Sequence, residues 1–356
     1  MSALVVPGPT SARHLSKTVM WITAGVSALV AFGIFAVLSA AGISEGFNIV
    51  AAVFVSAILF VLLSYVLSRI VEGRRKASDR LATGLVTTAF IVALLPLVSL
   101  VSTAFVNGLP RLDATFFSSS MRNVVGEGGG GLHAIMGTLE ITLAATIISV
   151  PIGIMTAIYL VEYGTGRLAR AITFFVDVMT GIPSIVAGLF AFALFAIVLG
   201  PGIRFGIGGA VALSILMIPV VVRSTEEMLK LVPNELREAS YALGVPKWLT
   251  IVKIVIPTAI GGIITGVMLS ISRIIGETAP LLIIVGMSTS MNYNLFSDRM
   301  ATLPVFVYTQ YASQGSDAQA YIDRAWTGAL VLIFIVMALN LIARLVSKLL
   351  APKGLR

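Results

Sequence analysis

The 356-residue sequence contains no cysteine and only two histidines, and both shortages exclude kinds of chemistry. Without cysteine the chain forms no disulfide and offers no thiolate nucleophile. His14 and His133 are far apart in the sequence and read as ordinary loop histidines, which argues against a histidine-based metal site. The G-x-x-x-x-G-K-[ST] motif is also missing, so we expect a chain that does not itself hydrolyse nucleotide and is not an enzyme.

Charge is scarce as well, because only 11% of the residues are charged whereas 58% are hydrophobic and the mean hydropathy is +1.02. A soluble domain of this size does not have such a composition. Isolated strands cannot satisfy their backbone groups in lipid, whereas helices can. The composition therefore predicts an all-α polytopic membrane protein.

Eight apolar runs reach the length of roughly 20 residues that crosses a hydrocarbon core. They cover residues 19–41, 49–70, 84–106, 134–161, 171–199, 207–222, 258–287 and 326–350. The first run is too long for the apolar region of a signal peptide and no small-residue cleavage pattern follows it, so we expect it to be retained. An even number of spans places both termini on the same side.

The positions of Lys and Arg predict which side that is. With the N-terminus in the cytoplasm, the external segments hold five arginines, namely Arg111, Arg122, Arg204, Arg299 and Arg324. Arg223 and Arg273 fall at or inside predicted spans, and the other 17 of the 24 cationic residues are cytoplasmic. Membrane proteins normally carry this excess of positive charge inside. The bias predicts cytoplasmic termini and explains the net charge of +8 without nucleic acid.

A glycine-rich segment, 126–131, formally satisfies the G-x-G-x-x-G pattern of dinucleotide-binding proteins. No predicted strand precedes it and no βαβ unit surrounds it, so we reject that interpretation. Together with a preceding serine run it predicts a flexible external connection over residues 116–133.

The most polar segment lies between the sixth and seventh apolar runs and predicts a tight helical corner. Pro233 can start a helix, and residues 234–243 continue it with apolar residues on one face. Gly244 permits the left-handed backbone that ends a helix, and Pro246 can open a second short one. An amphipathic helix lying on the membrane surface would show a similar pattern, so docking of a soluble partner is one of two interpretations.

The side chains of this corner favour the docking interpretation. Ala239 and Ser240 are small and would fit closely into a groove, while Arg237 and Glu238 can make charged contacts at its rim. Lipid offers such a polar surface nothing to bind. The partner is therefore expected to be a soluble protein.

The spacing within the corner resembles the EAA loop of ABC importer permeases, with the pattern E-A-A, three residues, G, nine residues, I-x-L-P. Glu238, Ala239 and Ser240 are followed at these intervals by Gly244 and by Ile254 to Pro257; Ser240 replaces the second alanine and Ile256 the leucine. The resemblance implies a type I importer (MetI-like) fold for residues 84–350 and a coupling helix that docks on an ATP-binding subunit. The residues it implies in coupling are Arg237, Glu238, Ala239, Ser240, Gly244, Ile254 and Pro257.

Two charges inside the seventh run suggest a path for an anion. Arg273 lies about 15 residues into it, roughly 22 Å along a helix, where a cation costs several kcal/mol unless it faces partners or water. Glu277 is one turn further on and is expected to share its face, so the pair either neutralise each other or line a path. The run is too long for one perpendicular span, which predicts tilt or a break near Gly276 and Pro280. Arg223, at the cytoplasmic end of the sixth run, either reaches for the interface or adds a second cation to the path.

The fifth run contains residues whose backbone groups could also line this path. Gly181 and Pro183 predict a kink that packs against a neighbour or opens backbone groups toward the path, and Ser184 favours the second interpretation. Asp177 is expected to pair with a neighbouring helix. Glu140 and Glu162 lie near helix ends and require no special function.

The segments 181–188 and 273–281 look like the signatures of phosphate importer permeases, specifically the PstA-type subunits. The resemblance associates Arg223, Arg273 and Glu277 with phosphate passage. It implies a bacterial inner-membrane subunit that pairs with a second (PstC-type) permease, two ATP-binding (PstB-type) subunits and an external phosphate-binding (PstS-type) protein. ATP and magnesium would bind the partner ATPase, and this chain would hold no cofactor. A permease for sulfate, molybdate or phosphonate, and an ATP-independent anion channel or carrier, are the alternatives.

The predicted organisation follows from these assignments. Residues 1–18 form a cytoplasmic tail, 19–83 two additional N-terminal helices with a basic loop, 84–350 the permease core and 351–356 a second cytoplasmic tail. Within the core, 107–133 and 288–325 are external loops and 224–257 is the cytoplasmic coupling loop.

Overall fold

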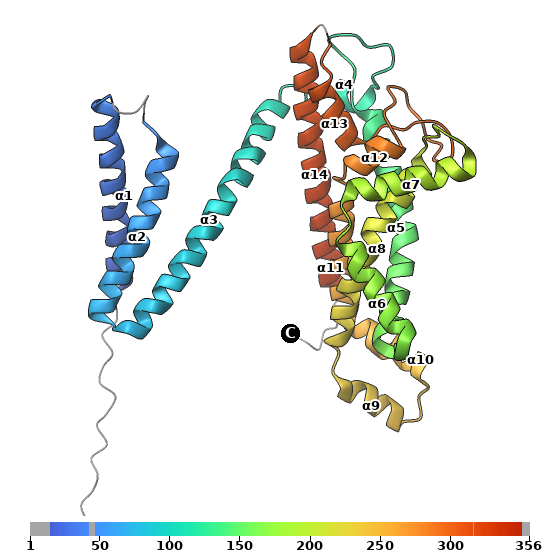
Figure 1. Cartoon of the computed structure of the whole chain (residues 1–356), viewed down its shortest axis with the longest axis horizontal. Helices are drawn as coiled ribbons and strands as arrows, with labels where there is room; N and C mark the ends of the chain where they lie inside the picture. The colour runs from blue at the N-terminus through green and yellow to red at the C-terminus, as the bar shows by residue number, and fades with distance from the viewer. Residues whose placement is uncertain (1–14, 43–46, 316, 351–356) are drawn as a thin grey trace, which may run out of the picture. The chain divides into compact units, whose positions relative to one another are not determined.

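The computed structural model describes residues 15–42, 47–315 and 317–350, and its regular elements there are helical throughout. His14 and the predicted tail from residue 351 lie outside these ranges. The chain divides into two compact units, Met1–Val101 and Ser102–Arg356 (Figure 1). The first contains α1 (Lys17–Ala40), α2 (Ile49–Val71) and most of α3 (Arg74–Gly108).

The second unit holds the remaining helices. In chain order they are α4 (Ala114–Ser118), α5 (Leu132–Ile158), the π-helical turn η1 (Tyr159–Tyr163), α6 (Gly166–Thr180), α7 (Ser184–Leu199), α8 (Gly206–Lys230), α9 (Asn234–Ala242), α10 (Lys247–Thr250), the π-helical turn η2 (Ile251–Val255), α11 (Ile256–Ile274), α12 (Ala279–Ile284), α13 (Leu303–Ala312) and α14 (Ala318–Leu350). Thus α4 lies inside the first predicted external loop, and α13 and the start of α14 inside the second.

Seven of the described helices or helix runs are long and apolar enough to cross a membrane, and the count is eight if α6 and α7 form one bent span. This confirms the all-α polytopic fold class. The fifth predicted run is not straight, because α6 and α7 meet at 110°. Pro183 lacks an N–H and disfavours helical backbone at Ile182, so the helix ends at Thr180 and restarts at Ser184.

The seventh predicted run is also interrupted, as the sequence led us to expect. Helix α11 ends at Ile274, and α12 begins at Ala279 with Pro280 in its first turn. Pro257 directly follows the π-helical turn η2 inside the continuous helical run Lys247–Ile274, so the proline coincides with an irregularity of the helix and not with its start. The breaks in the fifth and seventh runs both follow from local proline and glycine chemistry.

Small residues allow α1 and α2 to pack closely within the first unit. The buried positions of α1 are Thr23, Ser27 and Ala31, spaced four residues apart on one face. The Thr23 and Ser27 hydroxyls donate to the Val19 and Thr23 carbonyls of their own helix at 2.8 Å each. Such residues are typical of helix contacts in lipid, where close approach of backbones replaces the hydrophobic effect.

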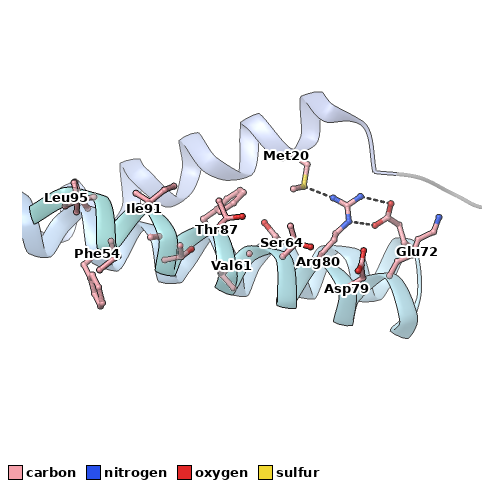
Figure 2. Close-up of a pocket in the computed structure, with 18 of the residues that line it drawn as sticks. Met20, Phe54, Val61, Ser64, Glu72, Asp79, Arg80, Thr87, Ile91 and Leu95 are labelled. Atoms are coloured by element: carbon pink, nitrogen blue, oxygen red, sulfur yellow. Dashed lines mark hydrogen bonds and ion pairs between the residues drawn. The ribbon is translucent and has the colours of Figure 1, made fainter. Parts of the chain in front are cut away.

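An ion pair holds the turn between α2 and α3, as Figure 2 shows. Arg80 Nε lies 2.7 Å from Glu72 Oε2, and Arg80 Nη2 donates to Glu72 Oε1 at 2.8 Å. The Leu15 N–H also donates to Oε1, at 2.8 Å. The hydrogen bond from Arg80 is the main reason that the pKa of Glu72 falls to about 2. This carboxylate is therefore ionised at every physiological pH.

A cavity of about 650 Å³ lies within the first unit, and Figure 2 shows its lining. Helices α2 and α3 touch where a Cβ added at Gly84 would lie 3.3 Å from Val61 Cγ2. Apolar side chains such as Phe54 and Leu95 line the cavity, whereas Glu72 and Arg80 contribute charged groups. The residues predicted for coupling or for the substrate path are not among the described residues that line it.

Helix α8 is the centre of the second unit and is covered on most sides. A Cβ at Gly209 would lie 2.3 Å from Val285 Cγ2, and one at Gly266 of α11 only 2.4 Å from Ser224 Oγ. On the α5 side, a Cβ at Gly153 would lie 2.6 Å from Val221 Cγ1. Glycine therefore sets how closely α12, α11 and α5 approach α8. Helices α9 and α10 lie at the end of this unit opposite to α12 and α13 (Figure 1).

Two arginines tie down the glycine-rich segment that we expected to be a flexible loop. Arg324, only 1% exposed, donates from Nη1 to the Gly126 and Gly128 carbonyls at 2.7 and 3.0 Å. Arg111 Nη2 donates to the Gly129 carbonyl at 2.8 Å. The backbone carbonyls of glycine are not shielded by a side chain, so the several N–H donors of a guanidinium group can reach them. The composition of the segment did not predict these hydrogen bonds.

His133 is not a loop residue, contrary to the sequence prediction. It lies in the first turn of α5, is 2% exposed, and packs edge-on against Phe306 with ring centroids 5.6 Å apart. The helix starts before the apolar run that we used to delimit it. Described residues include no group of three or more His, Cys, Asp or Glu arranged to hold a metal ion.

Candidate functional site

Helices α9 and α10 form the predicted corner. Pro233 is the residue immediately before α9, although we expected it to be the first residue of that helix. Pro246 likewise immediately precedes α10. Gly244 has a φ of +75° and its N–H donates to the Tyr241 carbonyl at 2.9 Å. The Val245 N–H donates to the Ser240 carbonyl at 3.2 Å. These two bonds form a Schellman motif, so glycine at 244 turns the chain between the helices.

Ser240 faces the inside of the corner and not its surface. Its Oγ lies 2.7 Å from Thr250 Oγ1, and Ser240 is only 3% exposed. This hydrogen bond connects α9 to the end of α10. The Ser240 side chain is therefore buried inside the corner and does not lie on its surface, contrary to the prediction. Glu238 and Ala239 are exposed as expected.

Arg237 also points inward, contrary to the expectation of a contact at the rim. Its Nη2 lies 2.8 Å and its Nε 3.1 Å from Glu162 Oε1 in η1. Arg237 further donates to the carbonyls of Val232 at 2.7 Å and Leu229 at 3.0 Å, and to Asn234 Oδ1 at 3.3 Å. The side chains of Arg237 and Glu162 are 12% and 4% exposed, so this is a largely desolvated ion pair. It anchors the start of α9 to η1, the turn that follows α5.

Glu162 is a functional candidate that the sequence did not reveal. It was expected to require no special function, yet besides its ion pair with Arg237 it accepts a hydrogen bond from Lys247 Nζ at its backbone carbonyl. Lys247 lies over the Tyr163 ring, 4.8 Å from its centroid. Its position directly after an apolar run was the one feature of the sequence that pointed to Glu162. Its partner, Arg237, could not be predicted because it lies 75 residues away in the sequence.

The outer surface of the corner exposes large apolar side chains next to Glu238. Tyr241, Leu243 and Trp248 are 41%, 83% and 61% exposed. An apolar patch with a charged neighbour outside the spanning helices marks an interaction surface. Such a surface suits a protein partner or the membrane interface, which are the two interpretations of the corner.

The structure brings the two motifs proposed for the substrate path together. A Cβ at Gly188 of α7 would lie 2.5 Å from Pro280 Cα, so α7 and α12 are in backbone contact. These are the short helices that follow the two breaks. Gly181 and Pro183 are exposed within the first break, and Ser184 is half-buried.

Arg273 and Glu277 do not share a helical face. Helix α11 ends at Ile274, so Glu277 lies in the break and the expected one-turn spacing does not apply. Its N–H donates to the Ile274 carbonyl at 3.1 Å. Within the described chain, neither side chain has a hydrogen bond or ion pair, and mutual neutralisation is therefore not observed. Arg273 is exposed and Glu277 is half-buried.

Arg223 has a different environment because it is already paired. Its Nη1 donates to Glu226 Oε2 at 2.8 Å, and its Nη2 pairs with Asp177 of α6. Glu226 Oε1 in turn receives Lys230 Nζ at 2.6 Å. The expectation that Asp177 pairs with a neighbouring helix is confirmed. Arg223 therefore links α6 to α8, and its charge is balanced where that of Arg273 is not.

Comparison with known proteins adds to this geometry. Residues 149–355 match the family described as "Binding-protein-dependent transport system inner membrane component". The chain is similar to "Phosphate transport system permease protein PstA 1" of Mycobacterium tuberculosis (strain CDC 1551 / Oshkosh), with 48% identity over 276 residues, 77% of this chain and 90% of the relative. It is also 39% identical to the phosphate transport system permease protein PstA of Haemophilus influenzae over 273 residues, 76% of this chain and 94% of that protein.

Among solved structures, an inward-facing conformation of the MetNI methionine ABC transporter is similar to this chain. The TM-score is 0.49 at 18% sequence identity, covering 61% of this chain and 94% of the other.

Proposed function

Because this chain belongs to the family of inner-membrane components of binding-protein-dependent transport systems, we propose that it is the permease subunit of an ATP-driven importer of inorganic phosphate. It is a multi-pass membrane protein. We further propose that it resides in a bacterial cytoplasmic membrane with both termini in the cytoplasm, which the distribution of Lys and Arg supports. The observation that carries the proposal is the unpaired guanidinium of Arg273 at a helix break inside an apolar run.

Arg273 and Glu277 have complementary chemistry for hydrogen phosphate. A guanidinium group presents a planar pair of donors to phosphoryl oxygens. An ionised carboxylate only accepts hydrogen bonds, so Glu277 can receive the proton that hydrogen phosphate carries. Sulfate carries no proton near neutral pH. It would therefore be repelled by the carboxylate and could not donate a hydrogen bond to it. Arg273 would therefore attract both oxyanions, and Glu277 would favour phosphate.

Replacing Glu277 with Gln should reduce the preference for phosphate over sulfate by at least roughly ten-fold, because the amide no longer repels sulfate and also donates to it. The measurement is ATP-dependent uptake of each labelled anion by the reconstituted complex. Glu127→Gln, which neutralises an exposed glutamate in the glycine-rich segment, is the matched control. An unchanged preference in Glu277→Gln would remove this residue from substrate discrimination.

The corner of α9 and α10 would couple transport to ATP. It connects the ends of α8 and α11, so a displacement of the corner is delivered to the helix that carries Arg223 and to the helix that carries Arg273. We propose that its exposed apolar patch docks on an ATP-binding subunit, which would hold ATP and magnesium. A second permease subunit would complete the path, and an external binding protein would deliver phosphate.

Reconstitution tests the proposed function directly. Proteoliposomes that contain this chain with its ATP-binding and second permease subunits should accumulate phosphate only with ATP and the binding protein. Proteoliposomes that contain this chain alone should not. Phosphate movement by the chain alone without ATP would instead indicate an anion channel or carrier. Transport of sulfate, molybdate or phosphonate in place of phosphate would identify a different oxyanion permease.

A further inference from the structure

Two arginines meet at Gly286, at the end of the second unit opposite to the coupling corner. A Cβ added at Gly286 would lie 3.3 Å from Arg204 Nη1 and 3.5 Å from Arg299 Cδ. Both side chains therefore converge on the backbone at Gly286. Arg204 is half-buried and Arg299 is exposed, so solutes have access to the pair.

Neither arginine is balanced by an acidic group of the residues that the structure describes. Within the described part of the chain, the guanidinium groups of Arg204 and Arg299 make no ion pair or side-chain hydrogen bond. Asp298 precedes Arg299 in the sequence but pairs with neither arginine. The N-terminus of α8 begins two residues after Arg204, and its first turn has no acidic residue. The positive end of the helix dipole therefore adds to two like charges.

The backbone around the pair is held in place. Gly286 has a φ of +76° directly after α12, a conformation that other residues adopt at a cost. The Ile207 N–H donates to the Leu295 carbonyl at 2.7 Å, which ties the following loop to α8. Asn292 Nδ2 donates to the Ser297 carbonyl at 2.8 Å and to the Arg299 carbonyl at 3.2 Å. Arg299 therefore projects from an ordered turn.

Capping of α12 does not explain the pair. An arginine near a helix C-terminus can bind the last carbonyls. The Ile284 carbonyl already accepts the Phe205 N–H at 3.3 Å, and the Leu281 carbonyl accepts the N–H groups of Val285 and Gly286 at 2.9 and 3.0 Å. Neither arginine donates to them. Two guanidinium side chains that converge on one point of the backbone, beside a helix N-terminus, instead have the chemistry of an anion site.

We propose that Arg204 and Arg299 form an outer capture site for a small oxyanion, which holds the anion before it reaches Arg273 and Glu277. This rests on the proposed function and adds a first step to it. Helix α12 lies between the two sites, with Glu277 before its first residue and Gly286 after its last. Six residues of helix measure about 9 Å, so the two sites lie at opposite ends of one short helix.

The chemistry of the outer site differs from that of the inner one. Guanidinium groups donate but do not accept hydrogen bonds, so the pair binds phosphate and sulfate alike. The site is exposed, and salt screens its attraction. We therefore infer that capture is unselective and depends on ionic strength, whereas discrimination occurs at Glu277.

Equilibrium binding of labelled inorganic phosphate to the full complex in nanodiscs of zwitterionic lipid tests the site. The double variant, with Arg204→Gln and Arg299→Gln, should bind one phosphate fewer per chain than wild type. In wild type, sulfate should compete with phosphate for that site. Arg122→Gln removes an exposed arginine of the glycine-rich loop region and should bind as wild type does. The single variant Arg299→Gln alters only an exposed side chain and should weaken binding about ten-fold even if the double variant does not assemble.

Unchanged phosphate binding in Arg299→Gln and in the double variant would overturn the proposal. A phospholipid headgroup carries the same phosphoryl oxygens, so a second set of nanodiscs contains anionic lipid. If the variants lose only their binding of anionic lipid and keep that of phosphate, the pair is a headgroup site and the proposal is wrong. A wild-type complex that binds phosphate at this pair but does not transport it would contradict the proposed function and not the outer site.

Discussion

Replacing Arg273 with alanine is expected to lower ATP-dependent phosphate uptake about ten- to hundred-fold, because hydrogen bonds to charged groups contribute roughly 1.5 to 3 kcal/mol. Arg273 is exposed and has no ion pair with the residues that the structure describes, so the substitution removes a binding group without leaving a buried partner uncompensated. Initial rates in proteoliposomes with the complete complex measure the effect. We expect Arg273→Lys to retain part of the activity, since a point charge attracts phosphate but lacks the planar fork.

Arg344→Ala provides the matched control, because Arg344 is an exposed arginine of α14 without a described ion pair. Uptake in this variant should equal that of wild type. Uptake that survives Arg273→Ala would remove Arg273 from the path. Arg223 is a less informative target, because its removal also uncovers Asp177 and Glu226.

Replacing Arg237 with alanine is expected to uncouple the complex and abolish most of the uptake. Breaking a buried ion pair costs about 3 to 5 kcal/mol, which shifts the equilibrium between the attached and the detached corner by at least roughly a hundred-fold. Glu162 would be left buried, and the carbonyls of Val232 and Leu229 would lose the hydrogen bonds that Arg237 donates. The corner would then no longer be held against η1. Retention of the ATP-binding subunit during purification, ATP hydrolysis and phosphate uptake should be measured together.

A double variant and a control make this prediction specific. Glu162→Met with Arg237→Leu removes both charges and should recover part of the uptake, since no uncompensated charge remains. Arg167→Ala removes an exposed cation near the start of α6 and should have no effect. Wild-type uptake in Arg237→Ala would show that the ion pair does not hold the coupling corner.

Local chemistry predicted the interruptions of the helices well. Pro183 and Pro280 each restrict the backbone of the adjacent residues. The breaks in the fifth and seventh runs could therefore be predicted from a few neighbouring residues. The Schellman motif at Gly244 was readable for the same reason. The angle of 110° between α6 and α7 was not, because the packing of α7 against α12 determines its direction.

The orientation of individual polar side chains was predicted less well. Arg237 and Ser240 were expected on the surface of the corner, yet Glu162 and Thr250 draw them inward. Glu277 was assigned to a helical face that ends before it. In each case a partner or a helix end outside the local sequence decides the direction of the side chain.

The sequence by itself determined that this chain is a helical membrane protein, where its helices break, and which residues form a corner with the spacing of a coupling loop. Those properties depend on composition, apolar length and the backbone preferences of Pro and Gly, which act within a few residues. The tertiary structure alone decided which charges are free. Asp177 neutralises Arg223 and Glu162 neutralises Arg237, whereas Arg273, Arg204 and Arg299 have no such partner among the described residues. Pairing depends on distances across helices that are remote in sequence, and only folding sets those distances.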